Sequence, residues 1–290
     1  MNILLIGASG FIWRNVAALL TQAGHRIVPA SRRTGFDFTS MTDPGDWLPH
    51  LDGIDAVINS VGIIGETSRQ RFVTLHRDAP IALFQACFQV GLRRVIQISA
   101  LGADDSAFSS YHLSKRAADE ALLDLNIDGI VLRPSLIYGR GGGSAELLLR
   151  LARLPFLPVI GNGAQALQPV HIADVAAAVL HCLNTPPSGQ RLDLVGNETV
   201  SFADWLARMR AAQHLPPAPH LAIPPSLALA AFHLLRHAHP LLQPDNLRML
   251  LTGYHAKPGP FSTFLGRSPL PFSPELFFLD APEALSWTTH

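Results

Sequence analysis

The sequence predicts an α/β fold, in which a parallel sheet is covered by helices on both faces and is followed by a smaller, mainly helical C-terminal lobe. Three observations support this class. Short apolar runs alternate with stretches of helical spacing through the first two-thirds of the 290 residues. The first run leads directly into a glycine-containing turn, and the density of prolines rises after His214. Strands that alternate with helices pair in parallel through right-handed crossovers, so the sheet is expected to be doubly wound.

Five short apolar runs are expected to form the strands of this sheet. They are almost continuously apolar, which is typical of strands that are covered on both faces. In chain order these runs are Asn2–Ile6, Arg26–Ala30, Asp55–Asn59, Arg94–Ser99 and Gly129–Arg133. Helices are expected between them, at Phe11–Ala23, Glu66–Val90 and Ser109–Leu125.

A division of the chain is expected near residue 140. Residues 1–140 form the main core, and residues 141–290 hold later core elements and the smaller lobe, which is clearest after residue 200. The later elements are expected as helices at Ser144–Leu154, at Ile172–Leu183 and from Ser201, with a strand at Arg191–Val195. The apolar stretch Pro225–Leu242 is broken by histidines, an arginine and a proline, so we expect an amphipathic or buried helix rather than a membrane span.

Composition and charge exclude several classes of protein. Hydrophobic residues make up 48% of the chain and charged residues 15%, so a large core is expected and disorder is not. The 22 basic and 22 acidic residues balance, and no lysine- or arginine-rich run occurs, so no nucleic-acid partner is expected. Met1 leads straight into a strand-like run rather than a signal peptide, which favours a cytoplasmic location. Cys87 and Cys182 lie in apolar stretches and are expected to be buried thiols.

The turn after the first strand, Gly7-Ala8-Ser9-Gly10-Phe11-Ile12, predicts a dinucleotide-binding site of the Rossmann type. Gly7 permits the tight turn, and Gly10 lets the backbone approach a pyrophosphate. The N–H groups of the helix that begins here face the anion. The cofactor-binding residues expected in this turn are Gly7, Ser9, Gly10, Phe11 and Ile12. The alternative is a glycine turn with a structural role alone.

Trp13 stands where the third glycine of such a turn is expected. That glycine normally lets the helix pack closely against the sheet. Tryptophan is the largest replacement possible, so either the helix tilts or the indole points elsewhere. The affinity for a cofactor therefore depends on where this side chain goes.

The end of the second expected strand discriminates between NAD and NADP. An acidic residue there would accept a hydrogen bond from a ribose hydroxyl, whereas a basic one would pair with a 2′-phosphate. The sequence has Arg32 and Arg33 at this point and no acid, which favours NADP, with NAD as the alternative cofactor. A solvated arginine pair is the other interpretation. Asp37 and Phe38 are then expected to frame the adenine, and Ser60-Val61-Gly62 to border its ribose.

Tyr111 and Lys115 form a Tyr-x-x-x-Lys pair at the start of an expected helix. Positions i and i+4 share one helix face, so both side chains point into one cleft. The ammonium is expected to lower the pKa of the phenol and to hold the nicotinamide ribose, while the tyrosine exchanges a proton with the substrate. Ser99 is the third expected catalytic residue, although Leu101 occupies the position where its hydroxyl is wanted. An exposed helix pair without a catalytic role is the alternative.

Together these motifs resemble the extended or atypical short-chain dehydrogenase/reductases of the NAD-dependent epimerase/dehydratase superfamily. The resemblance is strongest to the NAD(P)H-binding accessory subunit of respiratory complex I and its bacterial relatives. It covers about residues 3 to 180 in order and is thin beyond residue 200. Besides the glycine turn and the Tyr–Lys pair, the segments that carry it are Val57–Gly62, Ile98–Ala103, Leu132–Ser135 and Gln168–Ala176.

The resemblance implies an NAD(P)-binding sheet, in which Lys115 and Pro134 also contact the cofactor, and a lobe that selects a small-molecule substrate of unknown identity. Members reduce, epimerise or dehydrate small molecules or nucleotide sugars, so an NADP-dependent oxidoreductase or an epimerase/dehydratase-type enzyme is expected. Others hold the dinucleotide without turnover, so a structural, assembly or redox-sensing protein is the alternative. A habit of the superfamily also predicts a homodimer through helices 66–90 and 109–125, or a place in a protein complex.

No metal site is expected. His233 and His237 have i, i+4 spacing and His239 follows, but no acidic third ligand or His-Glu-x-x-His pattern accompanies them. These histidines are interpreted as one polar face of a helix.

Overall fold

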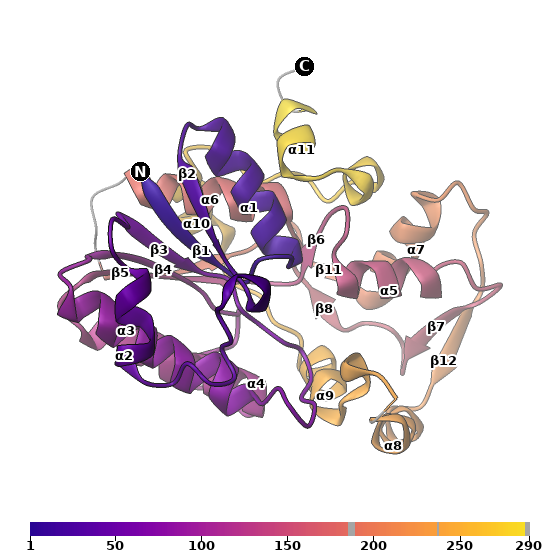
Figure 1. Cartoon of the computed structure of the whole chain (residues 1–290). Helices are drawn as coiled ribbons and strands as arrows, with labels where there is room; N and C mark the ends of the chain where they lie inside the picture. The colour runs from indigo at the N-terminus through magenta and orange to yellow at the C-terminus, as the bar shows by residue number, and fades with distance from the viewer. Residues whose placement is uncertain (185–188, 237, 288–290) are drawn as a thin grey trace. The chain divides into compact units, whose positions relative to one another are not determined.

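A six-stranded parallel sheet forms the centre of the first compact unit of the computed structural model (Figure 1). The structure describes residues 1–184, 189–236 and 238–287. The strand order is β10-β5-β4-β3-β1-β2, and every neighbouring pair is parallel. The order reverses between β1 and β3, which is where ligands bind in open sheets of this kind. The strands are β1 Asn2–Ile6, β2 Arg26–Ala30, β3 Ala56–Asn59, β4 Arg94–Ile98, β5 Asp128–Pro134 and β10 Arg191–Leu194.

Helices cover both faces of this sheet. Figure 1 shows α1 and α6 on one face and α2, α3 and α4 on the other, so the predicted doubly wound α/β fold is confirmed. The helices are α1 Phe11–Gln22, α2 Pro44–Trp47, α3 Ala79–Gln89, α4 Ser110–Asp124 and α6 Ile172–Asn184, and the 3₁₀ turns are η1 Arg32–Thr34 and η2 Leu48–His50.

The five predicted strands are confirmed to within one residue at each end. These strands could be predicted from apolar runs because helices bury them on both faces. All four residues of β3 and four of the five residues of β1 are buried. The interior of the unit then closes around large side chains such as Trp47 and Phe84, which are fully buried.

Two predicted helices are wrong in length. The helix expected at Glu66–Val90 begins only at Val73, because residues 66–72 form a loop in which Glu66 Oε1 accepts the N–H of Phe72 at 2.8 Å. Its first turns are a π-helix, η3 Val73–Asp78, which runs into α3. The stretch expected as one helix at Pro225–Leu242 forms α8 Pro225–Leu235 and a separate 3₁₀ turn, η4 Pro240–Leu242. Pro240, the first residue of η4, has no N–H to donate to a carbonyl of the preceding turn, so α8 does not continue through it.

The chain divides into two compact units. The first comprises Met1–Pro134 and Val175–Leu194, and the second comprises Ser135–Asp174 and the residues from Val195 onward. The division expected near residue 140 concerns where a substrate-selecting lobe begins, and it stays a prediction.

The second unit is mainly helical and carries only short strand pairs. Its core is an aromatic cluster in which the Tyr138 ring lies edge-on to Trp205, Phe272 and Phe277 at centroid distances of 6.0, 5.2 and 5.3 Å. The strand pairs are β6 Ile137–Tyr138 with β9 Val170–His171, β7 Leu157–Ile160 with β12 His220–Ile223, and β8 Ala166–Leu167 with β11 Val200–Ser201. The remaining elements are α5 Gly143–Leu151, α7 Phe202–Ala211, α9 Pro244–Thr252, α10 Pro258–Leu265, η5 Pro274–Phe278 and α11 Ala281–Trp287.

Two further expectations concern membranes and thiols. Within residues 1–184, 189–236 and 238–287, no helix has both the length and the apolar character needed to cross a bilayer. Cys87 and Cys182 are both buried free thiols, as expected, and burial raises the pKa of each to about 12.

Phe84 and Phe88 on α3 offer a matched test of the core of the first unit. Phe84 is fully buried, whereas Phe88 is 49% exposed. Phe84→Ala leaves a cavity and is expected to lower the free energy of unfolding by about 3–5 kcal/mol. Phe88→Ala one turn later should cost well under about 1 kcal/mol. Urea unfolding of both variants measures the difference, and equal losses would contradict this packing.

Candidate functional site

The glycine turn between β1 and α1 is held against the ends of both neighbouring strands. Gly7 and Ala8 each donate an N–H to the carbonyl of Ala30 at the end of β2, at 3.2 and 3.1 Å. On the other side, Ser60 Oγ donates to the carbonyl of Ile6 at 2.6 Å. Gly7 has φ +99°, and a Cβ there would lie 2.9 Å from Ser60 Oγ. Only glycine fits this contact, which fixes the turn at the carboxyl edge of the sheet.

The N-terminus of α1 opens directly from this turn. Gly10 is the N-cap, and no side chain caps the helix. A Cβ on Gly10 would lie 3.1 Å from the carbonyl oxygen of Gly7, and Ser9 adopts the left-handed conformation with φ +83°. Phe11 and Ile12 follow as the first helical residues. Backbone N–H groups that open onto a turn without bulky side chains form the arrangement that receives a phosphate.

Trp13 does not occupy the space in front of the glycine turn. Its indole N–H donates to the carbonyl of Leu5 in β1 at 2.9 Å, and its side chain is half-buried. The indole therefore lies back along the strand, so α1 is attached to the sheet by a hydrogen bond where a glycine would allow closer packing. The N-terminal N–H groups of α1 lie ahead of this contact.

Arg32 and Arg33 stand at the carboxyl end of β2, in the 3₁₀ turn η1, and both are exposed. Ser31 and Thr34 cap this turn reciprocally, which holds the arginine backbone in place. Asp37 accepts hydrogen bonds from the N–H and Oγ1 of Thr39 at 3.0 and 2.8 Å. These bonds, with the nearby Arg32, hold the pKa of the Asp37 carboxyl below its ordinary value, so it stays ionised.

Phe38 takes a different place from the one expected. Its side chain is buried in the core and lies edge-on to Trp47 at a centroid distance of 4.9 Å. Of the two residues expected to frame an adenine, only Asp37 keeps a partly exposed side chain. Phe38 serves instead to anchor the Asp37 backbone to the core.

The loop after β3, Ser60-Val61-Gly62, contacts the end of β1 through Ser60 and approaches α4 through Gly62. Asn59 Oδ1 accepts the N–H of Val61 at 3.1 Å, which shapes the loop. A Cβ on Gly62 would lie 3.8 Å from Lys115 Nζ. The loop therefore brings the segment expected to border a ribose next to the lysine expected to hold another.

Lys115 lies on α4, whose N-terminus is capped by the Ser109 hydroxyl. Its side chain is 3% exposed, and Nζ donates to the carbonyl of Ile98 at the end of β4, at 3.1 Å. Nζ also lies 5.8 Å from the centroid of the Tyr111 ring, so the two side chains share a face as predicted. Burial lowers the pKa of Lys115 to about 8, against an opposing attraction to Asp119. Pro134 ends the neighbouring strand, where its carbonyl accepts the N–H of Leu101 at 2.9 Å.

The pKa of Tyr111 differs from the expectation. Lys115 was expected to lower it, but burial, followed by the nearby Asp119, raises the pKa of Tyr111 above its ordinary value. Burial disfavours the charged phenolate more than a partly desolvated ammonium favours it. Tyr111 therefore holds its proton in this structure.

His76 and Ser114 surround Tyr111 and were not identified from the sequence. His76 Nε2 accepts the N–H of Ile63 at 3.0 Å, so the proton is on Nδ1, which faces Ser114 Oγ at 3.3 Å. Ser114 Oγ in turn donates to the carbonyl of Tyr111 at 2.9 Å. Burial and the charge of Lys115 keep the pKa of His76 well below its ordinary value, so the ring is neutral. The π-helix η3 supplies this histidine, and such segments occur frequently at functional sites.

Ser99 lies at the end of β4, but its hydroxyl has another partner than the expected substrate. Ser99 Oγ donates to Oδ2 of Asp119, and both residues are buried. Burial raises the pKa of Asp119 to about 7, against the opposing effects of the Ser99 hydrogen bond and of Lys115. The Ser99 hydroxyl, one residue after the end of β4, is therefore hydrogen-bonded to Asp119. Leu101 stands at the position in the following loop where a catalytic hydroxyl is expected.

Comparison with known proteins places this arrangement in a family. Residues 3–195 match the NAD dependent epimerase/dehydratase family. The chain belongs to this family. Its six-stranded parallel sheet and flanking helices agree with the fold of solved epimerases, and a reductase and an epimerase-family protein are among its relatives.

Individual relatives differ in what their names describe. The chain is 28% identical to a ceramide reductase of Caulobacter vibrioides over 223 residues, which is 73% of this chain and 69% of that protein. It is 31% identical over 216 residues to subunit 9 of the NADH dehydrogenase [ubiquinone] 1 alpha subcomplex of Arabidopsis thaliana, which is 66% of this chain and 53% of that protein. The chain therefore spans about half the length of this mitochondrial relative. A UDP-glucuronic acid 4-epimerase from Bacillus cereus, solved with NAD, has a TM-score of 0.73 at 20% identity, with 99% of both chains covered.

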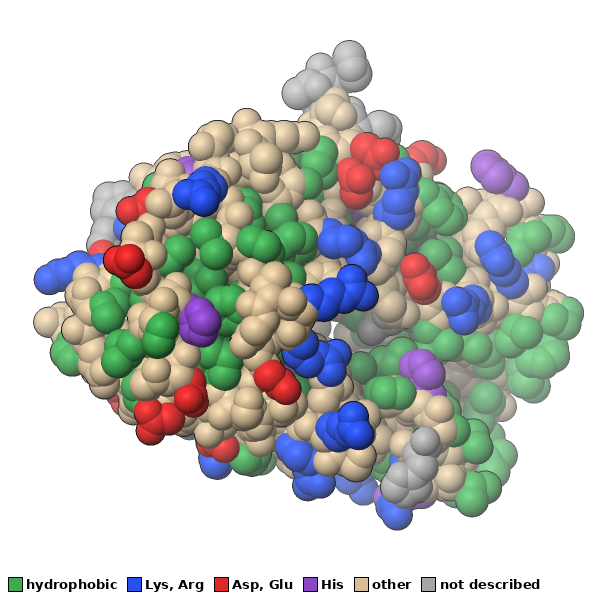
Figure 2. Space-filling view, viewed as in Figure 1, with side chains coloured by type: hydrophobic (Ala, Val, Ile, Leu, Met, Phe, Trp, Pro, Cys, Tyr) green, Lys and Arg blue, Asp and Glu red, His purple; other side chains and the backbone are tan. Residues whose placement is uncertain are grey.

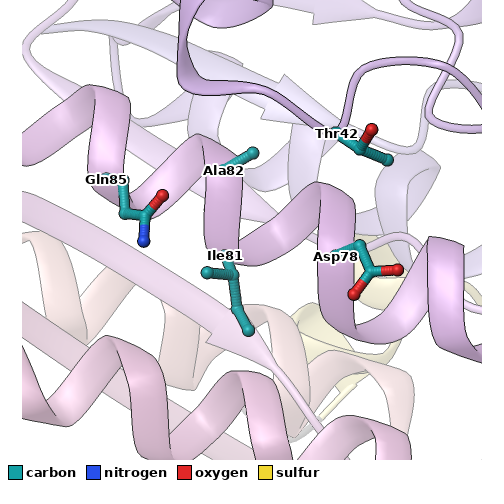
Figure 3. Close-up of a pocket in the computed structure, with 5 residues that line it drawn as sticks. All are labelled: Thr42, Asp78, Ile81, Ala82 and Gln85. Atoms are coloured by element: carbon teal, nitrogen blue, oxygen red, sulfur yellow. The ribbon is translucent and has the colours of Figure 1, made fainter.

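A separate depression of about 330 Å³ lies on the helical face of the first unit. Thr42, Asp78, Ile81, Ala82 and Gln85 line it, and Figure 3 shows that the residues of η3 and α3 lie opposite Thr42 across the opening. None of these residues belongs to the glycine turn, the arginine pair or the Tyr–Lys pair. Among the described residues, no group of three or more His, Cys, Asp or Glu could hold a metal ion; His237 lies outside them.

The raised pKa of Asp119 predicts that the stability of the protein depends on pH. Between its ordinary value of 3.8 and about 7, the folded protein holds a proton that the unfolded chain has lost. The contribution of Asp119 to stability therefore falls as the pH rises through this window. Asp119→Asn keeps an acceptor for Ser99 and stays neutral, so it should gain stability relative to the natural protein between pH 5 and pH 7.5.

Urea unfolding at the two pH values measures this gain. Asp124→Asn, an exposed acid at the end of the same helix, is the control and should show none. A difference between Asp119→Asn and the natural protein that does not change with pH would show that Asp119 is ionised at no cost.

Proposed function

We propose that this protein is an NADPH-dependent oxidoreductase that reduces a carbonyl group of a small molecule, with Tyr111 as the proton donor and Lys115 as its neighbour and ribose anchor. The observation that carries the proposal is the position of Lys115. Its buried ammonium lies 5.8 Å from the Tyr111 ring centroid, and Gly62 in the loop after β3 packs beside it. A buried ammonium is costly even with Asp119 one turn further along α4, so a lysine at this edge of the sheet favours a functional role.

The residues of the turn fit a dinucleotide. Gly7 and Gly10 keep the turn free of side chains, since a Cβ at either position would press against Ser60 or the Gly7 carbonyl, and no side chain caps the N-terminus of α1. In the proposal the backbone N–H groups of Ser9, Phe11 and Ile12 hold the pyrophosphate. Gly10, whose N–H donates to the carbonyl of Gly7, leaves room for it, and Asp37 accepts from the adenine. Ser60, Val61, Gly62 and Pro134 border the riboses and the nicotinamide. When bound, the nicotinamide supplies the hydride.

The choice of NADP over NAD rests on Arg32 and Arg33. Both guanidiniums are exposed at the carboxyl end of β2, where a 2′-phosphate is received in folds of this kind. A guanidinium pairs with a phosphate through two parallel N–H groups, which gives both charge and orientation. The match to an NAD-dependent family does not decide between NAD and NADP for this protein, so the assignment depends on these two arginines.

In the proposed reduction Tyr111 is the proton donor. A phenol that holds its proton donates it from Oη to a carbonyl oxygen as that oxygen gains negative charge. Lys115 lies beside the ring as an ammonium at neutral pH, since its pKa is about 8, and it stabilises the phenolate that remains. The neutral His76 donates to Ser114 and thereby holds the backbone that carries Tyr111.

A second candidate function is a dinucleotide-binding protein without turnover, acting in structure, assembly or redox sensing. Its support is Ser99, whose hydroxyl is directed to Asp119 rather than to a reacting oxygen. A relative that is named as a subunit of NADH dehydrogenase also fits this function. The two candidates share the cofactor site and differ in whether Tyr111 transfers a proton.

Tyr111→Phe separates these candidates. The variant keeps the ring packing and loses the hydroxyl, so turnover should fall at least about 100-fold while NADPH binding changes little. The assay follows NADPH oxidation with a panel of ketones, aldehydes and nucleotide 4-keto sugars. NADPH binding without turnover of any panel compound by the natural protein would favour the second candidate.

Arg32→Ala combined with Arg33→Ala tests the cofactor. Calorimetric titration should show a loss of about 10-fold or more in NADPH affinity, while NADH affinity changes little, because only the 2′-phosphate is lost as a partner. Arg26→Ala with Arg93→Ala is the matched control. It removes the same charge from two exposed residues at the amino edge of the sheet. Equal losses for the two cofactors would refute the assignment to NADP.

A further inference from the structure

The helix α8 is apolar on all sides and packs on only one. Its inner face is held by Ala228, with Leu229 and Phe232 partly buried, against Leu247 of α9 and Ile160 of β7. Serine and histidine are the only polar residues within its 11 positions. A surface helix of a globular protein normally carries polar residues on the face opposite its core contacts.

The outer face of α8 carries leucines instead. Leu227 is 61% exposed and Leu234 is 82% exposed, and their spacing of seven residues places both on one side of the helix. Leu235 at the end of α8 and Leu221 in the preceding strand β12 are each 46% exposed. Isolated exposed leucines are common, but four within 15 residues form a patch that requires an explanation.

The apolar surface continues onto the strand pair of the same unit. β12 pairs with β7, and Leu154 and Phe156, just before β7, are 37% and 40% exposed. Figure 2 shows hydrophobic side chains gathered over β7, β12 and α8 on the face in view. We name this set the α8 patch: Leu154, Phe156, Leu221, Leu227, Leu234 and Leu235.

The exposed charge at the end of α8 is positive, since Arg236 is its C-terminal cap. The whole chain is neutral, but the segment from Trp205 to Pro274 has Asp245 as its one acidic residue. Asp245 is already paired with Arg248 at 3.0 Å. Arg236 caps the C-terminus of α8 and is exposed, as are His233 and Lys257. Of the other cations of this segment, Arg208 and Arg267 are paired with Glu198 and Asp174, and Arg210 is buried.

We propose that the α8 patch docks the protein onto an anionic lipid bilayer, with the leucines of α8 inserted at the headgroup boundary and the exposed Arg236 at the end of α8 facing the lipid phosphates. Apolar side chains beside positive charge are the combination that binds such surfaces. A helix of 11 residues is about 16 Å long, which suits a position along the interface and is too short to cross it.

Charge favours a bilayer over a second copy of the chain. A symmetric dimer through the α8 patch would bring the exposed Arg236 of both copies to one interface, which costs electrostatic energy. An anionic bilayer offers this arginine charge of the opposite sign. The proposal does not depend on whether Tyr111 turns over a substrate, and its test uses no activity.

Cosedimentation with vesicles tests the docking. The natural protein should pellet with vesicles of phosphatidylcholine and phosphatidylglycerol in equal amounts, and less with pure phosphatidylcholine or at high salt. Leu227→Ser with Leu234→Ser should lower the partition coefficient roughly 10-fold or more, because two exposed leucines no longer enter the lipid. Arg236→Glu should weaken binding to the anionic vesicles alone.

Matched controls come from the first unit. Phe88→Ser with Val90→Ser removes two side chains that are each 49% exposed, and Arg93→Glu reverses another exposed arginine. Both should bind vesicles like the natural protein. Hydrogen exchange of the unmodified protein adds a measurement without substitutions, in which anionic vesicles should protect residues 225–235.

Three results would overturn the proposal. The first is no binding of the natural protein to either vesicle. The second is unchanged binding by the leucine variant. The third is a lipid-free dimer in sedimentation velocity that the leucine variant abolishes, because the α8 patch would then be an interface between copies of this chain.

Discussion

The close approach of Gly7 to Ser60 is the contact on which the candidate site depends. It exists because β1 and β3 are neighbours at the point where the strand order reverses, so the loops that leave them diverge to opposite faces. Ser60 ties its own loop to β1 through Ile6, and the same loop then passes Lys115. One backbone contact therefore sets the distance between the turn that faces a phosphate and the lysine that faces a ribose.

The parts of this arrangement that could be read from the sequence are those determined by local pattern. Strands buried on both faces leave continuous apolar runs, and the five strand predictions agree with the structure for that reason. The Tyr111–Lys115 pair follows from helical spacing alone. The glycine turn is visible because positive φ and close packing at Gly7 exclude every side chain.

The parts that could not be read depend on contacts between distant segments. α4 contains two pairs of a basic and an acidic residue at i, i+4, Lys115 with Asp119 and Arg116 with Glu120. The second is a surface ion pair at 2.6 Å, whereas the first is buried beneath the sheet edge. Nothing in the spacing distinguishes them. The position of His76 beside Tyr111 could not be predicted for the same reason, since the π-helix that turns it toward Ser114 has no sequence pattern of its own. The net charge of zero does not reveal the acid-poor segment from Trp205 to Pro274, because acidic residues elsewhere in the chain balance its positive charge.

Trp13 has a consequence beyond packing. Its indole is held by a hydrogen bond to β1, a few residues from the turn that is proposed to receive a dinucleotide. Indole emission overlaps the absorption of reduced nicotinamide, so a bound NADPH or NADH would accept excitation energy from this side chain. The residue that replaces a glycine in the family pattern thus supplies the site with its own optical reporter, through which occupancy is visible as quenched tryptophan fluorescence without any label.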